Sequence, residues 1–170
     1  MNHVLEREQL VGRPRGQVFA FFADASNLER LTPRSLRFEI KSSLPVDMRT
    51  GALIDYEIAL FGVRLRWRTL IECFEPETRF VDVQREGPYR SWRHTHEFVE
   101  VPNGTLVRDR VEYEVPLGLL GDLARRVFVG PQLDAIFDFR RKTIEQIFPQ
   151  VLAWTADDPR ACKGETPASA

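Results

Sequence analysis

R-E-G-P-Y-R-S-W-R-H-T-H-E-F, residues 85–98, is the stretch that decides the fold. It holds two of the three histidines and one of the three tryptophans of the chain. After the turn signal Gly87-Pro88 we expect a strand, in which successive side chains face opposite sides. One side of this strand carries aromatic residues and both histidines: Trp92, His94, His96 and Phe98. The other side carries Arg93, Thr95 and Glu97, so the position of the core decides whether the histidines are buried.

The preceding residues, 51–73, predict a hairpin that turns at Phe61-Gly62. If Leu60 pairs with Val63, mostly apolar residues meet on one face: Ile58 with Leu65, Tyr56 with Trp67, and Ile54 with Thr69. The other face pairs opposite charges: Glu57 with Arg66, and Asp55 with Arg68. A slip of one residue would mix the two faces, so the pattern specifies this register.

The following residues predict a second hairpin at Pro102-Asn103-Gly104-Thr105, where Asn-Gly suits a type I′ turn. With Pro102 opposite Thr105, the expected pairs are Phe98 with Asp109, His96 with Val111, His94 with Tyr113, and Trp92 with Val115. One face of this hairpin is charged and therefore belongs in water: Arg93, Glu97, Arg108, Arg110, Glu112 and Glu114. The residues expected to point inward are Trp92, His94, His96, Phe98, Asp109 and Tyr113.

The rest of the N-terminal half predicts short elements. We expect strands at residues 4–11, 36–41 and 79–85, and two short helices at residues 14–23 and 28–31. In the strand at 79–85, Val81 and Val83 share one face. By the same parity Arg85 points inward, at the rim of any cavity because it adjoins a turn.

A long helix is expected at residues 132–152, because one apolar stripe runs along it: Leu133, Ile136, Phe137, Ile144, Ile147, Phe148 and Val151. Arg140 falls on this stripe, whereas Arg141 does not. Residues 119–129 also predict a helix, interrupted by Gly130-Pro131. The long helix therefore starts either near Asp122 or near Pro131. We expect one domain at residues 1–152 and a disordered tail at residues 153–170.

Composition excludes several classes of protein. The chain has 170 residues, a formal net charge of −1 and 43% hydrophobic residues, which is typical of a globular domain. No basic excess favours nucleic acid, and no apolar run of about 20 residues favours stable membrane insertion. The N-terminus lacks the features of a signal peptide. We therefore expect a cytoplasmic protein, and the sequence leaves open whether it forms a homodimer.

An antiparallel sheet with one charged face needs a cover on the other, which the long helix supplies; the fold class is α+β. The chain resembles the helix-grip superfamily of START-type lipid-transfer domains, Bet v 1 and polyketide cyclases, in a bacterial ligand-binding subgroup. The resemblance spans residues 4–148 and lies in V-F-A-F-F-A-D-A-S-N-L-E (18–29), R-W-R-T (66–69), R-F-V-D-V-Q (79–84) and G-P-Y-R-S-W-R-H-T-H-E-F (87–98). It implies six or seven strands curled around the helix, with an apolar cavity that holds a lipid, sterol, polyketide or similar molecule.

The residues that we expect to bind a ligand in such a cavity are Tyr56, Trp67, Thr69, Arg85, Trp92, His94, His96, Asp109, Tyr113, Phe137 and Arg140. A few polar groups among apolar walls are typical of small-molecule sites. The alternative is that the large aromatic residues only fill the core. His94 and His96 have a spacing that can chelate a metal, and Asp109 is near, but no third ligand is evident. We therefore expect no metal and no cofactor.

Two functions from different classes follow. The first is binding or carrying of a small, mainly apolar molecule. The alternative is a cofactor-free cyclase, dehydratase or hydrolase, in which the candidate catalytic residues are His94, His96 and Asp109, because histidine titrates near neutral pH. A third, weaker interpretation is an interaction module that keeps only the fold.

Overall fold

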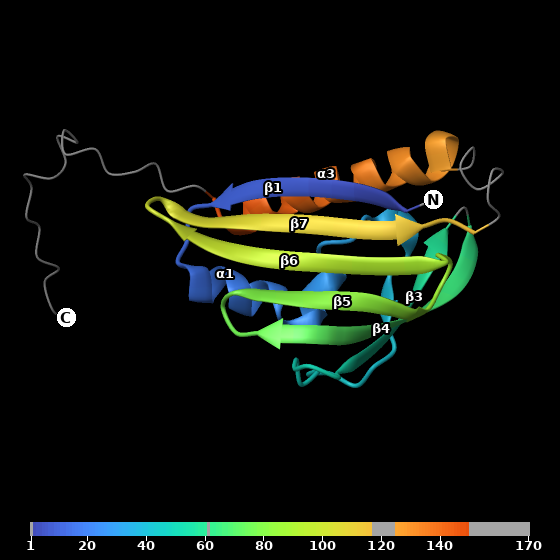
Figure 1. The fold of residues 1–170 in the computed structure, drawn as a ribbon, viewed down its shortest axis with the longest axis horizontal. Coiled ribbons are helices and arrows are strands. Elements are labelled where there is room, and N and C mark those ends of the chain that lie inside the picture. The colour runs from blue at the N-terminus through green and yellow to red at the C-terminus, as the bar shows by residue number, and fades with distance from the viewer. Residues whose placement is uncertain (1, 61, 117–124, 150–170) are drawn as a thin grey trace, which may run out of the picture.

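The computed structural model describes residues 2–60, 62–116 and 125–149. Seven antiparallel strands form one sheet in the order β1-β7-β6-β5-β4-β3-β2. They are β1 (His3–Val11), β2 (Glu39–Ile40), β3 (Leu53–Leu60), β4 (Val63–Glu75), β5 (Arg79–Glu86), β6 (Ser91–Val101) and β7 (Gly104–Glu114). The two α-helices of the described residues, α1 (Arg15–Phe22) and α3 (Gly130–Ile147), lie on the same side of the sheet (Figure 1).

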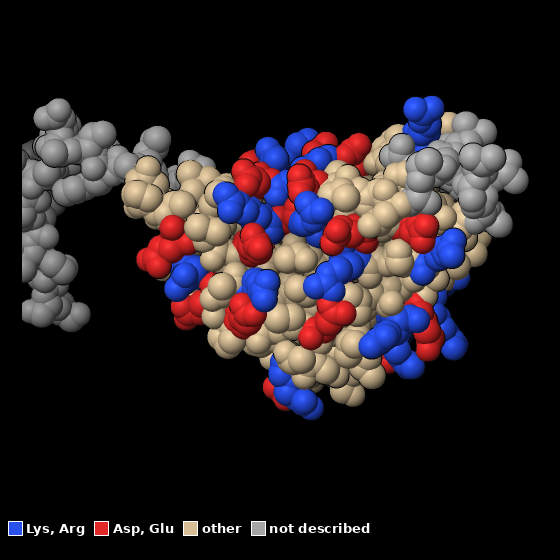
Figure 2. Space-filling model, viewed as in Figure 1, with Lys and Arg blue, Asp and Glu red and all other residues tan. Residues whose placement is uncertain are grey.

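The opposite side of the sheet faces solvent and carries paired charges. Lys, Arg, Asp and Glu side chains alternate over the strands in Figure 2. The expected pair of Asp55 and Arg68 is present at 2.6 Å, and Arg108 on β7 pairs with Glu8 on β1 at 2.7 Å. Alternation of buried and exposed residues along β6 and β7 matches this arrangement, so the predicted direction of the core is confirmed.

The register of the β3–β4 hairpin is as predicted, whereas that of the β6–β7 hairpin differs by two residues. Leu60 pairs with Val63. In the second hairpin Val101 pairs with Gly104, and His96 faces Asp109. Pro102 favours the observed turn, in which it is the first central residue and its φ near −65° suits a type I or II turn. In the predicted pairing it would be a ladder residue without an amide hydrogen to donate. A shift of two residues preserves the faces, so the predicted inward side chains still point inward.

The segments between α1 and β3 are more irregular than predicted. The second short helix is a 3-10 helix, η1 (Ala25–Leu28), which begins three residues before the expected start. The carboxylate of Asp24 caps it by accepting a hydrogen bond from the Ser26 amide at 2.9 Å. A further 3-10 turn, η2 (Arg34–Leu36), overlaps the start of the strand expected at residues 36–41. The observed strand there is therefore only the two residues of β2.

The α-helical part of the C-terminal helix begins at Gly130, next to Pro131, and the alternative start near Asp122 lies outside the described residues. A π-helical turn, η3 (Arg125–Val129), leads directly into α3, and Pro131 occupies the first turn, where a missing amide hydrogen costs nothing. α3 ends at Ile147 rather than at residue 152, because Phe148 precedes Pro149 and a residue before proline disfavours helix. Residues 150–152, the expected tail at 153–170 and residues 117–124 lie outside the described residues.

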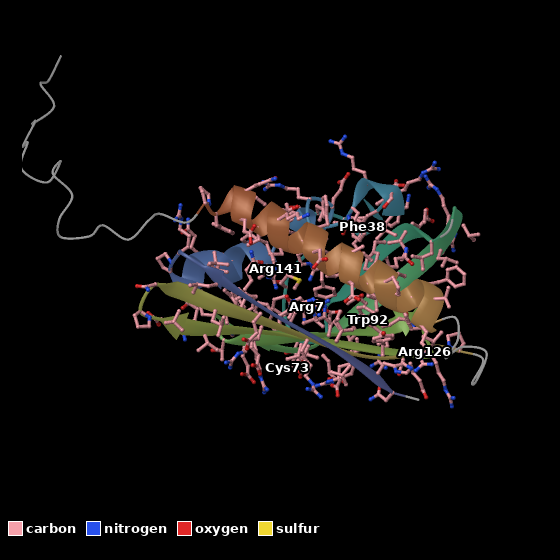
Figure 3. All side chains as sticks on the ribbon, turned by 90° about the horizontal axis from the view of Figure 1, so that it is seen from above. Arg7, Phe38, Cys73, Trp92, Arg126 and Arg141 are labelled. Atoms are coloured by element: carbon pink, nitrogen blue, oxygen red, sulfur yellow. The ribbon has the colours of Figure 1, made fainter. Side chains whose placement is uncertain are left out.

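α3 is fixed to the edge of the sheet by contacts with β1. Arg7 forms an ion pair with Asp134. The Gln9 amide group donates to the Arg141 carbonyl at 3.0 Å, and the Arg141 guanidinium donates to the Glu8 carbonyl at 3.2 Å. Figure 3 shows α3 crossing the sheet, with Arg7 and Arg141 near this junction. No described helix is long and apolar enough to cross a membrane.

The apolar core is divided along the length of α3. One cluster surrounds Phe19, Phe98 and Ile144 near the end of the helix. Another surrounds Leu133 and Phe137 near its start. The part of the inner space between the clusters is lined with both polar and apolar groups, and it contains the candidate site.

Candidate functional site

A cavity of about 160 Å³ lies between the inner face of the sheet and α3. Its walls come from β3, β4, β5 and β6, from the irregular segments before β2, and from one face of α3. Trp92 lies between the helix and the sheet in Figure 3. The sheet therefore supplies most of the wall, and the helix closes it.

Eight of the expected ligand-binding residues line this cavity: Tyr56, Trp67, Thr69, Trp92, His94, His96, Phe137 and Arg140. Asp109 and Tyr113 are buried but do not line it. Asp109 lies beyond the two imidazoles, and Tyr113 packs in the cluster around Leu133.

The inward orientation expected for Arg85 is wrong, because its side chain is exposed. Asp82 pairs with His94 across β5 and β6, and directly paired residues share a face. The inward side of β5 therefore carries Phe80 and Asp82, not Val81 and Val83. Arg85 lies opposite an irregularity in the β4–β5 register, where Arg68 pairs with Glu86 and Thr69 with Gln84. The alternation of two valines was a misleading signal for the inner face.

The centre of the polar wall is a pair of imidazoles between two carboxylates. His94 and His96 have ring centroids 3.7 Å apart. On one side, Asp109 Oδ1 lies 2.9 Å from His94 Nε2 and 2.8 Å from His96 Nδ1. On the other side, Asp82 Oδ2 lies 3.2 Å from His96 Nε2 and 3.7 Å from His94 Nδ1. We call these four residues the His/Asp cluster.

Protonation in the His/Asp cluster follows from these contacts. Burial lowers the pKa of His94, and the neighbouring charge of His96 lowers it further. Burial also acts to lower the pKa of His96, but contacts with Asp109 and Asp82 outweigh it and raise that pKa. Burial acts to raise the pKa values of Asp82 and Asp109, but both are lowered by the imidazoles that face them. These shifts favour a neutral His94, which donates from Nε2 to Asp109, and the charged form of His96 between two carboxylates.

Asp82 is the charged residue of the cavity wall that the sequence interpretation missed. One potential ligand atom from each of Asp82, His94 and His96 lies within 4.8 Å of the other two. The sequence already implied part of the answer: because His94 points inward, the residue paired with it on the neighbouring strand must also point inward. The missing information was the register of β5 against β6, which the Gly87-Pro88 turn did not specify.

The apolar wall is built of packed aromatic rings. Tyr56 and Trp67 stack with centroids 5.8 Å apart and planes 17° apart. Trp92 meets Trp67 edge-on at 5.4 Å. The Tyr56 hydroxyl is hydrogen-bonded to Thr69 Oγ1 at 3.2 Å, and burial raises the pKa of Tyr56, which keeps it a neutral phenol. Such a wall favours flat, apolar ligands.

Three buried nitrogens of the described cavity-lining residues make no hydrogen bond: Trp67 Nε1, Arg140 Nε and His96 Nδ1. His96 Nδ1 has Asp109 Oδ1 2.8 Å away, whereas the donors Trp67 Nε1 and Arg140 Nε have no acceptor among the described residues. Trp67 is only 6% exposed. Arg140 extends from α3, with its guanidinium carbon 5.1 Å from the centre of the Phe137 ring. A buried donor without a partner costs about 1–3 kcal/mol, so these groups favour an acceptor inside the cavity.

Solved structures with the same fold come from bacteria and plants. A protein from Chromobacterium violaceum superposes with a TM-score of 0.67 at 14% identity, over 86% of this chain and 97% of its own. A START superfamily protein from Mycobacterium smegmatis gives 0.64 at 14% identity, over 85% of this chain and 99% of its own. A major latex-like protein from Panax ginseng gives 0.64 at 12% identity, over 87% and 98%. At identities this low, the structural likeness shows the fold alone, and it confirms the helix-grip architecture.

Family membership comes from the sequence itself. None of the curated proteins matches the chain. The model of one family, described as polyketide cyclase / dehydrase and lipid transport, matches residues 11–140. This range is most of the chain and contains every residue of the His/Asp cluster as well as Trp67 and Arg140. The chain therefore belongs to the polyketide cyclase / dehydrase and lipid transport family.

Proposed function

We propose that the protein binds a compact, mainly aromatic molecule that carries an acceptor oxygen, inside the cavity between the sheet and α3. The observation that carries this proposal is the pair of buried donors, Trp67 Nε1 and Arg140 Nε, on an otherwise aromatic wall. A ketone, ester or ether oxygen would accept from one or both. Binding and carrying such a molecule agrees with the description of the family.

The size of the cavity narrows the ligand further. Its volume of about 160 Å³ is close to that of a cavity of about 150 Å³ in another protein that binds benzene. Pockets for larger, drug-sized molecules span roughly 300–1,000 Å³. A ligand of one or two rings therefore fits this conformation better than a lipid with long acyl chains.

Charge also favours a neutral ligand. In the protonation states that these shifts favour, Asp82 and Asp109 are each negative, and His96 and Arg140 are each positive. These four charges sum to zero, so the polar wall is already balanced. A ligand with a formal charge would leave one charge uncompensated at a buried site, where this is costly.

A matched pair of ligands tests the proposal. Acetophenone and ethylbenzene have nearly the same shape, but only acetophenone has an acceptor oxygen. We expect wild-type protein to bind both, as measured by ligand-observed NMR titration. Replacing Trp67→Phe removes the donor and keeps an aromatic ring, so it should lower the affinity for acetophenone relative to ethylbenzene by about fivefold, the worth of one hydrogen bond near 1 kcal/mol.

The control is Trp92→Phe, which changes a second tryptophan of the same cavity whose indole is not among the unpartnered donors. It should alter both affinities by the same factor and leave their ratio unchanged. The proposal would be wrong if wild-type protein bound neither compound at concentrations near their solubility. It would also be wrong if the two variants changed the ratio equally.

Acid/base catalysis is a second candidate, favoured by one observation: both imidazoles of the His/Asp cluster line the cavity and are backed by carboxylates. A neutral His94 within reach of a bound ketone could remove a proton from the adjacent carbon. The test is hydrogen–deuterium exchange at the acetophenone methyl group, followed by NMR in D₂O. Exchange faster than buffer that is lost in His94→Gln supports catalysis; exchange at the buffer rate in wild-type protein refutes it.

A further inference from the structure

We propose that Asp82, His94 and His96 form a binding site for a divalent transition-metal cation of the Zn²⁺ type, with Asp109 as the residue that positions both histidines. All three ligand residues line the cavity. Two imidazoles and one carboxylate are a common ligand set for catalytic zinc and related metals. This inference does not require the proposed ketone ligand, because it rests on the contacts within the His/Asp cluster alone.

The spacing of the ligand atoms fits a metal. Asp82 Oδ2 lies 3.2 Å from His96 Nε2 and 3.7 Å from His94 Nδ1. In a tetrahedral zinc site, metal–ligand distances of about 2.0–2.2 Å place neighbouring ligand atoms roughly 3.4 Å apart. The two observed separations lie on either side of this value. Movements of a few tenths of an ångström would bring both pairs to this spacing, and all three ligand atoms lie within 4.8 Å of one another.

Asp109 supplies the feature that separates a metal site from an ordinary buried pair. Its Oδ1 accepts a hydrogen bond from His94 Nε2 and lies 2.8 Å from His96 Nδ1. Histidines that bind metals usually donate their other ring N–H to a carboxylate or carbonyl, which fixes the ring and its tautomer. Here Asp109 accepts from His94, and the same oxygen lies beside the corresponding nitrogen of His96. The two remaining nitrogens consequently point to the side of Asp82.

The tautomer leaves a lone pair at the right place. His94 donates from Nε2, so Nδ1 of the neutral ring carries a lone pair, and 3.7 Å to Asp82 is too long for a hydrogen bond. A lone pair beside a carboxylate is unfavourable unless a cation or proton lies between them. His96 Nε2 lies 3.2 Å from the same carboxylate. A divalent cation would serve both nitrogens and the carboxylate together.

Three protein ligands leave a position open, as in catalytic rather than structural zinc sites. Because the three residues line the cavity, this position is accessible to a molecule bound there. With both histidines neutral, the charges of Asp82, Asp109, Arg140 and a divalent cation sum to +1. An oxygen anion from water or from a ligand at the open position would balance this charge.

The experiment titrates Zn²⁺ and Co²⁺ into full-length protein freed of metal with a chelator. We expect one equivalent of Zn²⁺ by calorimetry and intense visible absorption of tetrahedral Co²⁺. Asp82→Asn, His94→Gln and His96→Gln should each abolish the Co²⁺ spectrum. Asp109→Asn should keep the spectrum but weaken affinity by about 10–100-fold, the usual effect of losing a carboxylate that orients a ligand.

The control is His3→Gln, which removes the third histidine of the chain, away from the cluster. It should bind metal like the wild type. Because the buried variants can fail to fold, a second measurement uses wild-type protein only: Zn²⁺ should shift the imidazole ¹⁵N resonances of His94 and His96 and leave those of His3 unchanged. Absence of stoichiometric binding, shifts confined to His3, or equal binding by folded wild-type, Asp82→Asn and His94→Gln proteins would each overturn the proposal.

Discussion

Replacing Phe137→Ala should destabilise the protein strongly and enlarge its cavity. Phe137 is 6% exposed, and its ring packs against His94 with centroids 5.7 Å apart. Removing a buried phenylalanine ring costs about 3–5 kcal/mol. One side of this ring already borders the cavity, where it has fewer neighbours to lose, so we expect a value near the lower limit, about 3 kcal/mol.

The assay is urea unfolding followed by tryptophan fluorescence. The midpoint should fall with an unchanged slope, because the surface exposed on unfolding is nearly the same. In thermal unfolding, about 3 kcal/mol corresponds to a decrease of roughly 6–12 °C for a chain of this size. The enlarged cavity should also accept a two-ring ketone, such as acetonaphthone, more tightly than the wild type does.

A matched control lies two residues further along the same helix. Phe139 is 36% exposed, so Phe139→Ala should change stability by less than about 1 kcal/mol, as surface substitutions usually do. The reasoning would be refuted if the two variants had the same unfolding midpoint. That result would mean that α3 does not present Phe137 to the sheet.

Three further predictions concern the solvent-exposed face of the sheet, the β6–β7 turn, and Arg140 in the cavity. Arg66 is 90% exposed and lies 3.9 Å from Glu57. Arg66→Ala should therefore change the free energy of unfolding, measured with urea, by no more than about 1 kcal/mol. Gly104→Ala should destabilise the protein more than Gly51→Ala does in the same assay. Both glycines have positive φ, but of the two only Gly104 would place its new methyl group against backbone, 2.1 Å from the Val11 carbonyl oxygen. Arg140→Met should lower the ratio of acetophenone to ethylbenzene affinity about fivefold by NMR titration, because it removes the second unpartnered donor.

The sequence predicted the faces of the sheet better than its details. In β3 and β4, two rows of residues had to agree: aromatic and aliphatic pairs on one side, and Glu57 with Arg66 and Asp55 with Arg68 on the other. Only one register satisfies both rows, and it is the observed one. In β6 and β7, a shift of two residues keeps each row on its own side, so the pattern alone did not distinguish the predicted from the observed register.

The candidate site was predicted where it depends on alternation along one strand and missed where it depends on pairing between strands. His94 and His96 share the face of Trp92, which fixes their direction. Asp82 enters the site only because β5 pairs with β6 so that it lies opposite His94. Cavity volume depends on how α3 rests on the sheet, which no local pattern encodes.

A comparison of two variants tests whether the His/Asp cluster is kept for stability or for function. Deleting one partner, as in Asp109→Val, leaves the imidazoles facing an apolar group and should cost about 3–5 kcal/mol of unfolding free energy. Changing all four members and the neighbouring cation together, with Asp82→Val, His94→Leu, His96→Phe, Asp109→Val and Arg140→Met, removes the desolvation cost along with the pairing. Such replacements are often neutral or stabilising by about 1–4 kcal/mol. If the combined variant has the higher urea midpoint, the cluster is not kept for stability, and binding or catalysis is its reason. If it is less stable than Asp109→Val alone, the buried network is structural, and the site proposals lose their main physical support.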